Sequence, residues 1–258
     1  MASPQQQPCS SPLASRRRGL VRAVRWAAPA IMLAITPALA AGGGDEGPSF
    51  PCTAAKSAAE KAICADPALA AQDRRMASAY AKVLAALDAP GRAALRADQR
   101  FFLEVRDIQM ANAKPEDYDL KGDMQSRVDL LEAVDAKPRS GWGGSWVNTS
   151  GQIVVTPGAK GAYLVSILTV LPYPSYPTCD LTAEARADGG ALVVGGSAAE
   201  RKANEGWTVK LTRKGAALAA ELVRPATAEP GGPPFCGFRA SIDGTYLPMT
   251  PTARARTP

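Results

Sequence analysis

Apolar residues recur at intervals of three and four through residues 52–136, the spacing that places them on one face of a helix. The pattern predicts four helices, over about residues 57–64, 66–89, 93–110 and 120–134. We therefore expect a small antiparallel helical bundle. The clearest stripe consists of Leu69, Met76, Tyr80, Val83 and Leu87, with Asp73, Arg74 and Lys82 expected to point away from it.

Signals at the helix ends support this reading. Ser57 and Glu60 have the spacing of a capping box, in which each side chain bonds the backbone N–H of the other residue. Asp66-Pro67 combines a capping side chain with a proline at the first turn, so it predicts the start of the second helix. Pro90-Gly91 is expected to break that helix.

A different pattern begins after Lys137-Pro138, where Gly, Val, Thr and aromatic residues become frequent. Residues 207–212 alternate apolar and polar side chains, as in a strand with one face in water. Asp188-Gly189, Lys214-Gly215 and Asp243-Gly244 predict hairpin turns. About eight or nine short strands predict a small antiparallel β-barrel or sandwich over residues 140–248, and with the bundle an α+β fold. The expected strands cover residues 145–147, 152–156, 162–170, 180–187, 191–194, 207–212, 217–223, 235–240 and 245–247.

The first 40 residues have the order of a bacterial secretory signal peptide. Five arginines and no acidic residue precede an apolar stretch from Trp26 to Leu39, and Ala38-Leu39-Ala40 supplies the small residues that signal peptidase reads. The apolar stretch is short and contains two prolines, so we expect a cleavable signal at residues 1–40 and no membrane span after its removal. We expect a flexible leader at residues 41–51, a disordered tail at 249–258, and a periplasmic or secreted location.

Composition restricts the chemistry of the mature chain. The formal net charge is +6, but five of the basic residues lie in the predicted signal, and residues 41–137 hold 13 basic against 16 acidic side chains. This balance does not favour a nucleic-acid partner. The sequence contains no histidine, the commonest general base and metal ligand. Residues 117–123 superficially follow a calcium loop, but Lys121 and Val128 stand where acidic ligands are needed. We therefore predict no enzyme activity, no metal and no cofactor.

The cysteines predict two crosslinks. Of five cysteines, Cys9 leaves with the predicted signal, and the remaining even number fits an oxidising compartment. Four cysteines allow three pairings. Because two lie close together in the first half and the other two lie in the second half, we pair Cys52 with Cys64 and Cys179 with Cys236. The alternative, a zinc site, lacks any C-x-x-C spacing and any histidine.

A group of motifs in the helical half begins with the spacing C-x11-C. The motifs are Pro48-Ser49-Phe50-Pro51-Cys52, Glu60-Lys61-Ala62-Ile63-Cys64-Ala65-Asp66-Pro67, Leu69, Asp73-Arg74-Arg75-Met76, Tyr80, Gln99-Arg100-Phe101-Phe102 and Arg106-Asp107. Together they resemble the lysozyme inhibitor LprI-like N-terminal domain, which we place at residues 52–136. The resemblance implies an envelope protein and, in some relatives, inhibition of lysozyme. Two positions depart from the family pattern. Phe102 stands where the family usually has Trp, and Ile108 where a cysteine usually follows Arg-Asp, so a second bridge of this domain is expected to be missing.

Charged residues of these motifs are the first candidate binding site. Arg74, Arg75, Arg106 and Asp107 are predicted to form a binding surface for a partner protein. The alternative is a structural ion pair between helices with the remaining charge in solvent, since surface ion pairs are common and weak.

A stiff aromatic loop is the second candidate. Residues 171–177 alternate proline with other residues, and this predicts an extended loop in which Tyr173 and Tyr176 recognise a partner. The alternative is a rigid crossover that lies on the barrel. Gly144-Ser145-Trp146 loosely resembles the opening of lipocalin-type barrels, and Trp146 is expected to plug the base of the barrel.

These features predict an exported envelope binding protein, with inhibition of lysozyme by protein–protein contact as the specific hypothesis. The expected partner is lysozyme or another envelope protein. One alternative is a carboxylate-based envelope hydrolase in the β domain, which requires acids that converge in a cleft and a raised pKa. The other is a structural module that binds peptidoglycan or a protein without inhibiting anything.

Overall fold

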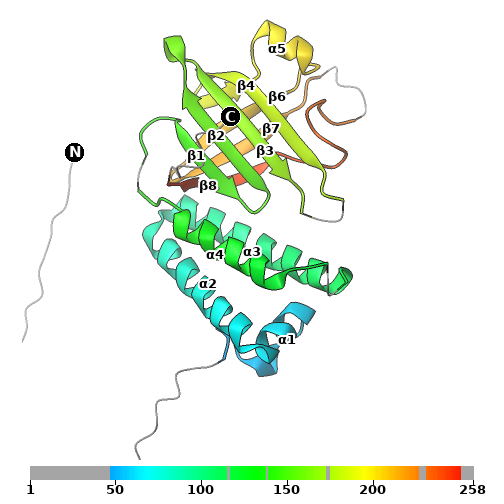
Figure 1. Ribbon diagram of the computed structural model, residues 1–258. Coiled ribbons are helices and arrows are strands. Elements are labelled where there is room, and N and C mark those ends of the chain that lie inside the picture. The colour runs from blue at the N-terminus through cyan, green and yellow to red at the C-terminus, as the bar shows by residue number, and fades with distance from the viewer. Residues whose placement is uncertain (1–46, 115–116, 138, 173–174, 227–230, 251–258) are drawn as a thin grey trace, which may run out of the picture. The chain divides into compact units, whose positions relative to one another are not determined.

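The computed structural model of the chain describes residues 47–250, apart from 115–116, 138, 173–174 and 227–230 (Figure 1). The predicted signal peptide, residues 41–46 of the predicted leader, Tyr173 and residues 251–258 of the predicted tail lie outside the described residues. None of the helices within the described ranges is long and apolar enough to cross a membrane.

The helical half has the four predicted helices, preceded by one short 3-10 turn (Figure 1). Ser57 and Glu60 make the predicted capping box, and the Asp66 carboxylate caps the second helix. The third helix begins earlier than expected, because Asp88 caps it and Pro90 occupies its first turn, where the N–H that proline lacks would have no helical partner. The elements are η1 (Cys52–Ala54), α1 (Ala58–Ala65), α2 (Pro67–Ala86), α3 (Ala89–Asn112) and α4 (Leu120–Ala133).

The predicted stripe faces the helical core, with Met76, Val83 and Leu87 buried and Leu69 and Tyr80 half-buried. The prediction that Asp73 points away from the core is wrong. Asp73 is only 3% exposed, and its carboxylate accepts the backbone N–H of Ser49 at 2.7 Å. This charge-assisted hydrogen bond offsets the burial of the carboxylate. Phe50 also packs against the helical core, so this part of the predicted leader contacts the bundle.

The strand-rich half is a closed antiparallel barrel, which decides between the two predicted architectures (Figure 1). Neighbouring strands follow sequence order, and β8 pairs with β1 to close the sheet. In β4 every second side chain from residue 179 to 185 is buried, the period of a strand with one face inside. The strands are β1 (Gly144–Asn148), β2 (Gly151–Pro157), β3 (Tyr163–Val170), β4 (Thr178–Asp188), β5 (Ala191–Val194), β6 (Thr208–Lys214), β7 (Ala217–Val223) and β8 (Gly244–Met249).

Two local predictions in this half are wrong. Residues 235–240 do not form a strand, and they pair with the sheet through a single bridge between Cys179 and Cys236. Arg239 has a φ of 67°, which interrupts an extended backbone. Asp243-Gly244 is not a hairpin turn, because Gly244 is already the first residue of β8.

One short α-helix and two 3-10 turns, η1 and η2 (Ala159–Gly161), were not predicted. The helix α5 (Ala198–Ala203) lies between β5 and β6 in the chain. Ser197 and Glu200 form a capping box of the same kind as Ser57 and Glu60, so the signal was present in the sequence. A helix of six residues is too short to show an apolar stripe, which is the pattern that revealed the others.

Both predicted disulfides are present, Cys52–Cys64 in the bundle and Cys179–Cys236 in the barrel half. Trp146 lies in the barrel core and is fully buried. The guanidinium groups of Arg139 and Arg213 lie 5.2 and 4.7 Å from the centre of its ring. These contacts place two cations on an electron-rich aromatic face, a favourable arrangement.

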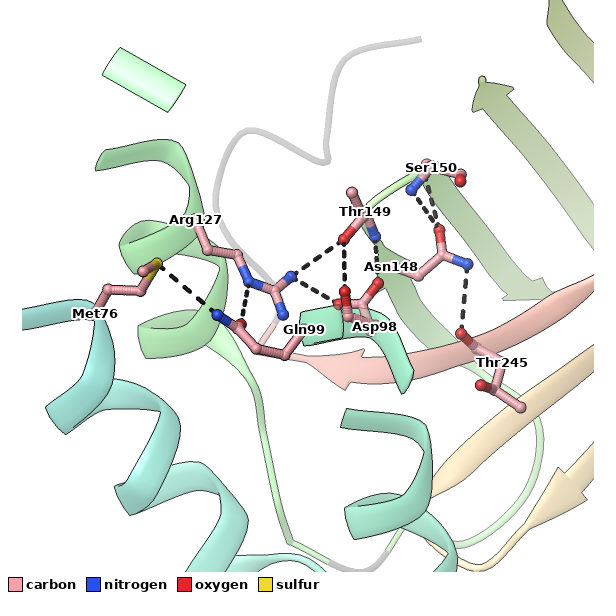
Figure 2. Close-up of polar contacts among 9 residues, drawn as sticks. Met76, Asp98, Gln99, Arg127, Asn148, Thr149, Ser150 and Thr245 are labelled. Atoms are coloured by element: carbon pink, nitrogen blue, oxygen red, sulfur yellow. Dashed lines mark hydrogen bonds and ion pairs between the residues drawn. The ribbon is translucent and has the colours of Figure 1, made fainter. Parts of the chain in front are cut away.

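The bundle and the barrel share apolar contacts and hydrogen bonds. The helical core cluster includes three barrel residues, Ala216, Ala217 and Leu247. Asp98 of α3 forms a buried ion pair with Arg127 of α4, with 2.6 Å between the carboxylate oxygen and Nη1 (Figure 2). The other oxygen of Asp98 accepts the backbone N–H of Thr149, in the turn between β1 and β2, at 2.7 Å. The two halves are therefore connected through α3.

Replacing Asp88 by alanine is expected to lower the free energy of unfolding by about 2 kcal/mol. Its carboxylate accepts the Gly91 N–H as the cap of α3 and the Ala216 N–H of the β6–β7 turn, both at 2.9 Å. Loss of a cap costs about 1 kcal/mol, and the N–H of Ala216 loses its partner as well. Urea unfolding of the mature protein measures the change.

The matched control is Asp119→Ala, since Asp119 caps α4 through the Gly122 N–H and makes no hydrogen bond to the barrel among the residues that the structure describes. We expect the free energy of unfolding of the control to fall by about 1 kcal/mol, the cost of losing the helix cap alone. Equal losses in the two variants would contradict a role for Asp88 in joining the bundle to the barrel.

Candidate functional site

The four charged candidates of the helical half do not form one surface. Arg75 pairs with Glu132 of α4 at 3.1 Å, and the two side chains are about half exposed. Arg74 donates to the backbone carbonyl of Gly47. Arg106 is buried and pairs with its neighbour Asp107 at 2.7 Å. For Arg75 the contacts match the structural alternative, an ion pair between helices.

The aromatic loop lies against α3. Gln109 of α3 donates from Nε2 to the carbonyl of Pro172 at 3.1 Å and to the hydroxyl of Tyr176 at 3.2 Å. Tyr176 is still 55% exposed and has a φ of 52°, a conformation that is unusual for a residue other than glycine. Tyr173 lies outside the described residues. The loop therefore contacts the bundle, as a crossover would, and also presents an aromatic side chain to solvent.

Residues of the motifs that resemble LprI meet instead at a groove between the leader, α1, α2 and α3, which we call the Arg100 groove. Its volume is about 510 Å³. Nine of its twelve lining residues belong to those motifs, and the exceptions are Ala77, Arg96 and Leu103. The lining consists of Ser49, Phe50, Glu60, Asp73, Met76, Ala77, Tyr80, Arg96, Gln99, Arg100, Leu103 and Arg106.

Helical periodicity explains why these residues share the groove. On α3 they recur at intervals of three and four, which places them on one face of the helix: Arg96, Gln99, Arg100, Leu103 and Arg106. On α2, residues 73, 76, 77 and 80 have the same spacing. The groove therefore combines an apolar part from Phe50, Met76 and Leu103 with arginines along α3.

The acidic side chains of the groove are already engaged by backbone donors. The Glu60 carboxylate accepts the N–H groups of Lys56 at 2.6 Å and Ser57 at 3.0 Å, and these bonds lower the pKa of Glu60. Asp73 accepts the N–H of Ser49. Neither carboxylate bonds an arginine of the groove within the described part of the chain.

The arginines differ from one another in their contacts. Arg106 is paired with Asp107, as described above. Arg96 and Arg100 are exposed, and neither has a hydrogen-bond or ion-pair partner among the residues that the structure describes. The groove thus offers two available cations next to an apolar surface, an arrangement suited to a protein partner with acidic and apolar groups.

Two titratable groups with shifted pKa values lie near Arg106. The Tyr118 hydroxyl donates to the Asp123 carboxylate at 2.7 Å. Burial raises the pKa of Asp123, and burial together with the bond to Asp123 raises the pKa of Tyr118. Both side chains are half-buried and bonded to each other, so we assign this pair to the packing of α4.

The barrel interior gives no support to the hydrolase alternative. Among the described residues, the buried polar side chains of the barrel are those of Ser145, Thr169 and Thr208, and no Asp or Glu of the barrel is buried. Within the described ranges, no group of three or more Cys, Asp or Glu residues is arranged to hold a metal ion.

Sequence reasoning identified Arg100 and Arg106 within motifs but did not single out Arg96. A signal was available, because Arg96, Arg100 and Leu103 have the spacing of one helical face. The buried pair of Asp98 and Arg127 was also missed, since nothing local indicates that residues 29 positions apart meet.

Comparison with curated proteins and with solved structures found no match. A comparison with family models matched residues 52–135, which are the helical half from η1 to the end of α4. The barrel lies outside this match. Residues 52–135 match the family described as lysozyme inhibitor LprI, so the resemblance seen in the motifs of this domain is confirmed.

Proposed function

We propose that the protein is exported through its N-terminal signal peptide to the bacterial envelope, where it inhibits lysozyme by protein–protein contact. The observation that carries the proposal is the Arg100 groove, in which nine of the twelve lining residues belong to the motifs that resemble LprI. The contact surface is the helical domain, and the barrel holds α3 through Asp98, Asp88 and Gln109.

Two further features support this proposal. Disulfides such as Cys52–Cys64 and Cys179–Cys236 are typical of proteins that fold in an oxidising compartment. The groove has the mixed character of interfaces between separate proteins, in which apolar contacts are surrounded by polar groups and arginine is enriched.

Filling the groove is expected to abolish inhibition. Ala77 lines the groove on α2 and is half-buried, so Ala77→Trp places a large side chain where the partner would bind. The mature wild-type chain, residues 41–258, is expected to slow lysis of bacterial cells by purified lysozyme at micromolar concentration. Ala77→Trp should raise the protein concentration that is required for the same inhibition by at least about tenfold. The reason is that the core of an interface needs close shape complementarity, which the added side chain would destroy.

The control is Ala85→Trp, an exposed position two turns further along α2 that does not line the groove. Circular dichroism and thermal unfolding verify that both variants are folded. If the wild-type protein leaves lysozyme fully active, the inhibitory function is wrong. If Ala77→Trp inhibits as well as Ala85→Trp does, inhibition takes place elsewhere on the molecule.

A further inference from the structure

Arg96 and Arg100 form an unusual pair within the Arg100 groove. They are one helical turn apart on α3, so their side chains are neighbours, and like charges at this spacing are mildly unfavourable in an isolated helix. Both are exposed, and no carboxylate among the described residues compensates them. The two acids of the same groove, Glu60 and Asp73, are engaged by backbone N–H groups instead.

The pair lies in a domain that is acidic overall. Residues 41–137 hold 13 basic and 16 acidic side chains. A polyanion such as a nucleic acid would be repelled by this surplus, because its binding depends on extended positive charge. The pair is therefore suited to short-range contact with a few carboxylates. At such short range, the more distant charges of the domain are screened by salt and change the interaction energy little.

We infer that Arg96 and Arg100 bind two neighbouring carboxylates of the partner, and that in lysozyme these are the acids flanking the scissile glycosidic bond. This inference rests on the proposed function. Lysozyme is a retaining glycosidase, whose two carboxyl groups lie about 5–5.5 Å apart. Residues four positions apart on a helix have Cβ atoms about 5–6 Å apart, so two arginine side chains that extend in parallel can hold their guanidinium groups at a separation close to that of the two carboxyl groups. Each guanidinium can donate two parallel hydrogen bonds to one carboxylate.

Inhibition follows directly from such a contact. One lysozyme carboxyl must protonate the leaving oxygen and the other must attack or stabilise the sugar. Two arginines bound there hold both groups as carboxylates and lower the pKa of the general acid, which must remain protonated to act. The apolar side chains of Phe50, Met76 and Leu103 next to the pair exclude water and thereby strengthen the ion pairs.

The test measures the affinity of the mature protein for purified lysozyme by titration calorimetry. Arg96→Gln/Arg100→Gln removes both charges and is expected to weaken binding about a hundredfold. Arg96→Lys/Arg100→Lys keeps the charge without the planar fork, so we expect an intermediate loss of about tenfold. The control Lys121→Gln/Lys202→Gln removes two exposed charges outside the groove and should change the affinity less than about twofold.

Two readouts separate this contact from a merely structural effect. Added salt should weaken wild-type binding more than it weakens binding by Arg96→Gln/Arg100→Gln, because the variant lacks the ion pairs. A chitin oligosaccharide that fills the glycan cleft of lysozyme should compete with the wild-type protein. If the wild-type protein does not bind lysozyme, the proposed function fails and this inference fails with it. If it binds but the glutamine variant binds equally well, or the oligosaccharide does not compete, the inference alone is overturned.

Discussion

Replacing Arg127 by alanine is expected to lower the free energy of unfolding by about 3–5 kcal/mol, the cost of leaving a buried charge without its partner. The side chains of Arg127 and Asp98 are 1% and 5% exposed, and their oxygen and nitrogen atoms lie 2.6 Å apart. Arg127 also donates from Nε to Gln99 at 2.9 Å and lies 5.2 Å from the centre of the Phe102 ring. Urea unfolding of the mature protein at neutral pH measures the loss.

The matched control is Arg75→Ala, which breaks the exposed ion pair with Glu132. Exposed pairs contribute about 0–1 kcal/mol, so the control should remain close to the wild type. The double variant Asp98→Leu/Arg127→Met should recover part of the stability lost in Arg127→Ala, because no buried charge then remains unpaired. Similar losses in Arg127→Ala and Arg75→Ala would show that the ion pair between α3 and α4 is not buried in solution.

The Arg127 pair also bears on the groove. Gln99 accepts a hydrogen bond from Arg127, donates from Nε2 to the sulfur of Met76 at 3.9 Å, and lines the Arg100 groove together with Met76 (Figure 2). Asp98, the ion-pair partner of Arg127, accepts the backbone N–H of Thr149 in the barrel. A hydrogen-bonded chain therefore runs from the groove wall to the β1–β2 turn, and it gives the barrel a physical means of positioning α3.

Removing the barrel disulfide with Cys179→Ala/Cys236→Ala is expected to lower the free energy of unfolding by about 4 kcal/mol. The bond closes a loop between residues 57 positions apart, so its removal frees much conformational entropy in the unfolded chain. The disulfide of the bundle closes a loop of only 12 positions. Its removal with Cys52→Ala/Cys64→Ala should therefore lower the free energy of unfolding by about 3 kcal/mol. Urea unfolding compares the two variants with the oxidised wild type.

Local contacts in the folded state add to the effect of the barrel disulfide. Asp180 donates its N–H to Phe235 at 2.9 Å, and Gly237 donates its N–H to Thr178 at 2.7 Å, so the crosslink lies inside a small hydrogen-bonded junction. Wild-type protein treated with a reducing agent serves as the second control. If reduction leaves the unfolding curve unchanged, the crosslinks are absent from the purified protein, and the oxidising location proposed for it loses its main support.

Structural features that depend on residues close together in the sequence could be predicted from the sequence alone. The four helices of the bundle, all eight barrel strands within a few residues and the resemblance to LprI rest on spacing of a few positions or on short motifs, and both cysteine pairs rest on the place of the cysteines in the two halves. A helix or strand periodicity determines which face of an element is apolar before any neighbour is known. The sequence could not decide between a barrel and a sandwich, because strands of both architectures show the same alternation of apolar and polar residues.

Contacts between segments that are distant in the sequence could not be predicted without the tertiary structure. Asp73 was expected to point away from the apolar stripe, and it is buried with its carboxylate bonded to the N–H of Ser49 in the leader. Arg75 and Arg106 occur in neighbouring motifs but face different partners, Glu132 and Asp107. The Arg100 groove, in which Arg96 and Arg100 have no ion-pair partner among the described residues, forms where α1, α2, α3 and the leader meet. Pairing, burial and the availability of a charge depend on side chains far away in sequence, and periodicity carries no information about which segments those will be.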